Sequence, residues 1–96
     1  ATSGAEAYQR GVEAFERRRW ARAIELFRQA LDFGRTGDTA ADAQLYLARA
    51  YAADRQYLLA TTEYGRFLGF YRDDPRLEDA AFERIEAYVA MSPSYE

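Results

Sequence analysis

The chain has 96 residues, a formal net charge of −3 and an aromatic content of 16%, which fits one small domain. It contains no cysteine and no histidine, and all 13 of its basic residues are arginine. These absences exclude disulfides, thiolate and lysine nucleophiles, and the commonest general base and metal ligand. The dispersed arginines of an acidic chain argue against nucleic-acid binding. An enzyme would depend on carboxylates or tyrosines alone, and none are spaced for a recognisable site, so we expect no catalytic residue, metal or cofactor.

Apolar residues recur at helical spacing in five successive segments, which are residues 5–17, 20–33, 40–54, 57–70 and 76–91. The second segment is the clearest, because Trp20, Ile24 and Phe27 follow the i, i+4, i+7 pattern of an amphipathic helix. The segments between the predicted helices contain residues typical of turns. Residues 34–39 include two glycines and a helix-capping side chain, and residues 73–75 have two acids before a proline. No segment alternates as a strand does, so the sequence predicts an all-α fold of five helices.

The sequence repeats at an interval of 37 residues. An aromatic residue aligns with an aromatic residue twice and a small residue with a small residue once, in the pairs Trp20/Tyr57, Phe27/Tyr64 and Ala23/Ala60. A further step of the same length aligns Ala43 with Ala80, Ala50 with Ala87 and Tyr51 with Tyr88. A helix–turn–helix unit therefore occurs twice, and its first half occurs a third time.

This unit resembles the tetratricopeptide repeat, which alternates an A helix and a B helix over about 34 residues. The positions that match its signature are Gly11, Trp20, Ala23, Phe27 and Ala30 in the first unit and Ala48, Tyr51, Tyr57, Ala60 and Tyr64 in the second. The resemblance implies a right-handed α-solenoid of antiparallel helix pairs with about two and a half repeats, in one domain fragment. We place repeat 1 at residues 5–38, repeat 2 at 39–75 and the first helix of repeat 3 at 76–96.

Arginine stands where the repeat family usually has glycine at the end of helix A. These residues are Arg18 and Arg55, so we expect either a strained left-handed residue or a different turn at each position. Two other arginines, Arg10 and Arg84, occupy a position that is normally leucine. Each either extends its charged end to water or meets an acid from a further repeat.

A narrower resemblance covers most of the chain. The sequence is similar to the BamD (ComL) family of outer-membrane β-barrel assembly lipoproteins in residues 40–51 and in Arg66-Phe67, Tyr71, Asp74-Pro75 and Ser92-Pro93-Ser94-Tyr95-Glu96. That family implies a protein at the periplasmic face of the outer membrane, held by a lipidated N-terminal cysteine. Its first repeats receive unfolded outer-membrane proteins, and its last repeats hold another subunit of the assembly machine. Periplasmic repeat proteins of the CpoB/YbgF type share several positions, so a general adaptor, periplasmic or cytosolic, is the alternative.

The chain contains no cysteine, so we expect membrane contact only through a lipid anchor outside these 96 residues. No apolar run approaches the roughly 20 residues of a membrane-spanning helix. The last predicted helix has no second helix to complete its repeat. We therefore expect Ile85 and Tyr88 to be exposed or to be covered by self-association.

The A helices of such solenoids line the concave face. We predict a peptide-binding groove there, formed by Tyr8, Val12, Phe15, Leu45, Arg49, Phe82, Glu86 and Val89. An apolar trough with few charges fits an extended or helical peptide with apolar or aromatic anchors, and a single arginine is too little for a carboxylate clamp. Two alternatives remain open: the apolar members pack against neighbouring A helices, and Arg49 forms an ion pair with Glu86 or Asp42.

Overall fold

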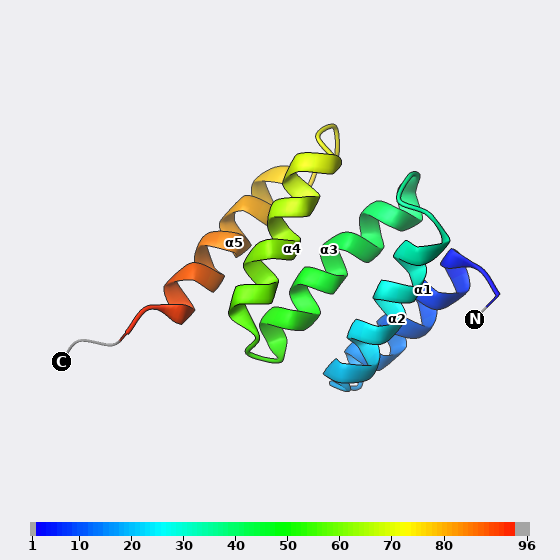
Figure 1. Ribbon diagram of the computed structural model, residues 1–96, viewed down its shortest axis with the longest axis horizontal. Helices are drawn as coiled ribbons and strands as arrows, with labels where there is room; N and C mark the ends of the chain where they lie inside the picture. Colours follow the sequence, from blue (N-terminus) through cyan, green and yellow to red (C-terminus); the bar gives the residue numbers. More distant parts are fainter. Residues whose placement is uncertain (1, 94–96) are drawn as a thin grey trace.

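The computed structural model describes residues 2–93, and within them five helices follow one another without a strand (Figure 1). They are α1 (Gly4–Glu16), α2 (Trp20–Phe33), α3 (Asp38–Ala53), α4 (Tyr57–Phe70) and α5 (Leu77–Met91). The predicted all-α fold is confirmed, and each predicted helix end lies within two residues of the observed one. Residues 94–96, which end the Ser-Pro segment of the family resemblance, lie outside the described residues.

The helices form an elongated array of antiparallel neighbours, with overall dimensions of 50 × 30 × 17 Å. Each helix packs against the next one along the chain, and α1 also contacts α3 (Figure 1). The two ends of the chain lie at opposite ends of the array. A contact between alternate helices is what a stack of helix pairs requires, because the first helix of one pair lies beside the first helix of the next.

Small residues on α1 allow α2 to pack closely against it. Ala7, Gly11 and Ala14 are the buried residues of α1. A Cβ atom at Gly11 would lie 2.6 Å from the Cε1 atom of Phe27, whose side chain is completely buried in the core. The absence of a side chain at position 11 therefore sets the distance between the two helices.

The turns after α1 and α3 contain the strained arginines. Arg18 has a φ of 59° and Arg55 a φ of 62°, in the left-handed region that glycine usually occupies. The amide of Arg18 donates to the carbonyl of Phe15, and that of Arg19 donates to the carbonyl of Ala14. This is a Schellman motif, and the same pattern recurs at Arg55. The first of the two expected alternatives, a strained left-handed residue, is confirmed at both turns.

A buried polar pair fixes α3 against α4. The Gln44 Nε2 atom donates to the backbone oxygen and to the Oε1 atom of Glu63, both at 2.9 Å. The second carboxylate oxygen of Glu63 accepts from Arg66 at 2.9 Å. Within residues 2–93, no fully buried side-chain nitrogen or oxygen lacks a hydrogen-bond partner, which removes most of the penalty for burying an amide and a carboxylate in the interior.

Helix α5 exposes an apolar face. Phe82, Ile85 and Tyr88 are 63%, 59% and 46% exposed, so the predicted exposure of the latter two residues is confirmed. Their counterparts one repeat earlier, Leu45, Ala48 and Tyr51, are buried. Self-association through this face stays a prediction.

Candidate peptide-binding site

Three alternate helices, α1, α3 and α5, are joined by one row of side chains. The aromatic rings of α1 contact Tyr46 of α3. The Arg49 guanidinium lies 5.3 Å from the centre of the Tyr46 ring. Arg49 in turn pairs with Glu83 of α5. We call this row and the cavity beside it the A-helix site.

The aromatic end of the A-helix site is a stack of three rings. Tyr8 and Phe15, two turns apart on α1, lie nearly parallel to the Tyr46 ring, with centroid distances of 5.9 and 5.5 Å. Both residues, with Val12 between them, are half-buried against the core. Burial, assisted by the nearby carboxylate of Asp42, raises the pKa of Tyr8 to about 12. These three predicted residues therefore take part in packing and keep a partly exposed edge.

Tyr46 was not predicted to be a site residue, because the 37-residue repeat aligns it with Gln9 and Glu83, neither of which is aromatic. The available signal was its spacing. It lies three residues before Arg49, on the same side of a helix.

The charged end of the A-helix site is a two-pronged ion pair. The Nε and Nη2 atoms of Arg49 donate to the two carboxylate oxygens of Glu83, each at 2.8 Å, and the Tyr64 hydroxyl donates to one of them at 3.0 Å. Burial disfavours the charged form of Glu83, but the hydrogen bonds and charge of Arg49 outweigh it and keep its pKa below the ordinary value. Burial and the Glu83 charge raise the pKa of Tyr64. The predicted pairing of Arg49 with Glu86 or Asp42 is wrong, because Glu83 takes all of these bonds.

A cavity of about 540 Å³ opens beside this ion pair, between α3, α4 and α5. Its lining consists of Arg49, Ala52, Tyr57, Tyr64, Glu83, Glu86 and Ala87. It brings together two of the predicted residues, Arg49 and Glu86. No ion pair involves Glu86 within residues 2–93, and Arg49 and Glu83 neutralise each other, so the rim of the cavity carries a net negative charge at Glu86.

The remaining predicted residues divide into two groups. Phe82 and Val89 are 63% and 65% exposed, and with Glu86 they form one ridge of α5 at i, i+4, i+7 spacing. Leu45, by contrast, is completely buried, so its assignment to the groove was wrong. Leu45 lies on α3, which packs against α1, α2 and α4, and a middle helix has less surface left for solvent than a terminal one.

A second arginine, Arg76, holds the start of α5 in place beside α3. It donates to Asp42 at 2.8 Å and to Asp74 at 2.9 Å, and it lies 5.8 Å from the centre of the Phe67 ring. Hydrogen bonds from Arg76 lower the pKa of Asp74. This arginine was also missed, because its partner on α3 lies far from it in sequence.

Of the two arginines at leucine positions, Arg10 fits the first alternative, because its charged end is exposed to water, whereas Arg84 fits neither. Arg84 donates to the backbone oxygen of Thr61 at 3.1 Å and lies over the Tyr88 ring. Arg10 lies on the surface, where its Nη2 atom is 3.6 Å from Glu6 on the same helix. Arg84 therefore links α4 to α5, and Arg10 pairs within its own helix.

No helix within residues 2–93 combines the length and the apolarity that crossing a membrane requires. A search of curated proteins found no match to the chain. The model of one protein family, YfiO, described as "Outer membrane lipoprotein", matches residues 1–95. This match agrees with the resemblance to BamD-like assembly lipoproteins and spans nearly every residue. The chain belongs to the YfiO family of outer membrane lipoproteins.

Proposed function

We propose that this chain is a non-enzymatic, protein-binding scaffold of the outer-membrane protein assembly machinery. It works at the periplasmic face of the outer membrane and binds extended or unfolded polypeptide, including the targeting segments of outer-membrane proteins, at the A-helix site. Other subunits of the machine are its further partners. The observation that carries the proposal is the cavity between α3, α4 and α5, together with the exposed ridge of Phe82, Glu86 and Val89 beside it.

The geometry suits a peptide rather than a small reactant. The cavity is open and lined by alanine, tyrosine and Glu86, with one ion pair whose groups are already satisfied by each other. Apolar ridges beside such a cavity hold large side chains, and partly exposed aromatic rings are frequent energetic centres of peptide recognition. The stack of Tyr8, Tyr46 and Phe15 extends the same surface onto α1.

The test uses fluorescein-labelled peptides from the aromatic C-terminal ends of outer-membrane barrel proteins, with scrambled peptides of identical composition. We expect the authentic peptides to bind more tightly in fluorescence anisotropy. Phe82→Asp and Val89→Asp should weaken this binding at least about tenfold, because each puts a charge into an apolar contact. Equal binding of authentic and scrambled peptides would favour the general adaptor instead.

The matched control is Leu58→Asp, at a residue of α4 that is 68% exposed and lies outside the A-helix site. It introduces the same charge and should leave binding unchanged. Circular dichroism establishes that all three variants stay folded. Unaltered binding by folded Phe82→Asp and Val89→Asp chains would exclude the α5 ridge as the site.

A further inference from the structure

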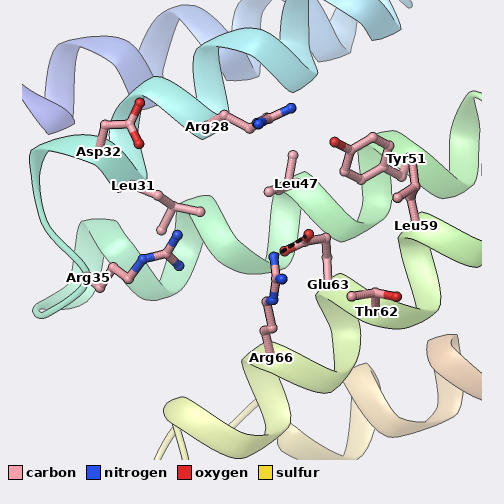
Figure 2. A pocket seen from close by; sticks show the side chains of 10 residues that line it. All are labelled: Arg28, Leu31, Asp32, Arg35, Leu47, Tyr51, Leu59, Thr62, Glu63 and Arg66. Atoms are coloured by element: carbon pink, nitrogen blue, oxygen red, sulfur yellow. Dashed lines mark hydrogen bonds and ion pairs between the residues drawn. The ribbon is translucent and has the colours of Figure 1, made fainter.

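The molecule has a second cavity, which shares no residue with the A-helix site. It lies between α2, α3 and α4 and has a volume of about 290 Å³. Figure 2 shows its lining, which consists of Arg28, Leu31, Asp32, Arg35, Leu47, Tyr51, Leu59, Thr62, Glu63 and Arg66. Leu31, Leu47 and Tyr51 are buried members of the core, so the floor of the cavity is fixed by the packing of the fold.

Three arginines surround this cavity. Arg28, Arg35 and Arg66 enter it from different sides (Figure 2). Arg66 pairs with Glu63, whose other oxygen accepts from Gln44. Arg28 and Arg35 form no ion pair within residues 2–93, although Asp32 lies between them in sequence. With Glu63 neutralised by Arg66, two arginines face one aspartate, and the cavity is locally cationic in a chain whose net charge is −3.

An apolar cavity adjoins the cationic one. It also has a volume of about 290 Å³, and its lining is Arg35, Gln44, Arg66, Gly69, Phe70 and Tyr71. Arg35 and Arg66 therefore border both cavities. Phe70 is 58% exposed, with its ring 4.9 Å from that of Tyr71 in an edge-on contact. The Tyr71 hydroxyl donates to the backbone oxygen of Arg35 at 2.8 Å. This bond fixes the position of Tyr71, which lines the apolar cavity, relative to Arg35, which borders both cavities.

We infer that these two cavities form a docking surface for an acidic peptide segment that carries an aromatic or large aliphatic side chain. The carboxylates of the peptide lie among Arg28, Arg35 and Arg66, and its apolar side chain lies against Phe70 and Tyr71. Guanidinium groups bind carboxylates through paired hydrogen bonds, and arginine beside exposed aromatic rings is the composition of energetic centres in protein interfaces. A small anion would use the arginines and leave the Phe70 pocket without a role. Both features together select a peptide.

The probe is a short fluorescein-labelled peptide in which glutamates flank one phenylalanine. Two partner peptides replace the glutamates by glutamine or the phenylalanine by serine. We expect only the first to bind the 96-residue chain in fluorescence anisotropy, and each replacement to weaken binding at least about tenfold. In nuclear magnetic resonance titrations its shifts should fall on Arg28, Arg35, Arg66 and Phe70.

The variants are Arg35→Glu and Phe70→Ser, at two exposed positions whose side chains form no hydrogen bond within residues 2–93. Both should weaken binding at least about tenfold, while the controls Arg17→Glu and Leu58→Ser, at exposed residues outside both cavities, should not. Equal weakening by Arg17→Glu would show a general charge effect and overturn the proposal. Displacement by inorganic phosphate with no effect of Phe70→Ser would show a small-anion site only. Chemical shift changes that map onto α5 would place the peptide at the A-helix site and overturn the proposal. If the Phe82→Asp chain still binds the peptide, the two sites are distinct.

Discussion

Gly11 offers the sharpest test of how the first two helices pack. The substitution is Gly11→Ala, and the matched control is Gly69→Ala, because both glycines lie within helices. At position 11 the new Cβ atom would lie 2.6 Å from Cε1 and 2.7 Å from Cδ1 of Phe27. At position 69 no heavy atom of the described residues outside the local helix lies within 4 Å of the new Cβ.

The two substitutions share one favourable effect and differ in one unfavourable effect. Alanine gains about 0.5–1 kcal/mol over glycine in a helix interior, and the gain at position 69 is at the low end because α4 ends at Phe70. Overpacking of a filled core costs about 1–3 kcal/mol, and the Phe27 ring is completely enclosed. We therefore expect Gly69→Ala to raise the free energy of unfolding by about 0.5 kcal/mol and Gly11→Ala to lower it by about 0.5–2 kcal/mol.

Urea unfolding followed by circular dichroism measures both values under the same conditions. Gly65→Ala provides an intermediate case, because its Cβ would lie 2.7 Å from the Nη2 atom of Arg84, the flexible end of a side chain that can move aside. If the Gly11→Ala chain is as stable as the Gly69→Ala chain, the Phe27 ring yields without cost. Position 11 would then not set the distance between α1 and α2.

Three further predictions concern stability. Arg18→Gly and Arg55→Gly should each stabilise the chain by about 1 kcal/mol in urea unfolding, because glycine tolerates positive φ; Arg17→Gly, at a φ of −89°, should not, and a gain there would contradict the strain argument. The pKa of Glu83 is lowered from its ordinary 4.5, so its carboxylate adds stability that is fully present above about pH 4.5 and is lost as the pH falls through the folded-state pKa. Glu83→Gln should therefore flatten the acid side of the stability–pH curve, and an unchanged curve would rule out this contribution. Leu45→Ala should cost about 2–5 kcal/mol, whereas Leu58→Ala should change stability by less than about 0.5 kcal/mol; similar values for the two in thermal unfolding would contradict the burial of Leu45.

Helix positions and turn strain could be predicted because they depend on local sequence. The apolar spacing from Trp20 to Leu31 and the arginines at positions 18 and 55 each act within one or two turns of helix. The partners across the array depend instead on how helices far apart in sequence lie together. Arg49 was expected to form an ion pair, but its partner Glu83 is 34 residues away, and two other acids fitted the sequence equally well.

The 37-residue repeat also explains the error at Leu45. A repeat assigns equivalent roles to equivalent positions, so Leu45 and Phe82 were placed in the same groove. Their exposed fractions are 0% and 63%, because α3 has neighbours on both sides and α5 packs mainly on α4. The repeat therefore predicts which residues occupy equivalent positions on their helices, but it does not predict whether another helix covers them.

The junctions between alternate helices use different forces at the two ends of the array. Rings of Tyr8, Phe15 and Tyr46 join α1 to α3, whereas ion pairs from Arg49 and Arg76 join α3 to α5 and the residue before it. Salt weakens half-exposed ion pairs and leaves ring stacking nearly intact. Of the two junctions, ionic strength therefore acts mainly on the one between α3 and α5: raising it loosens α5, with the cavity and the apolar ridge beside it, while the contact between α1 and α3 keeps its arrangement.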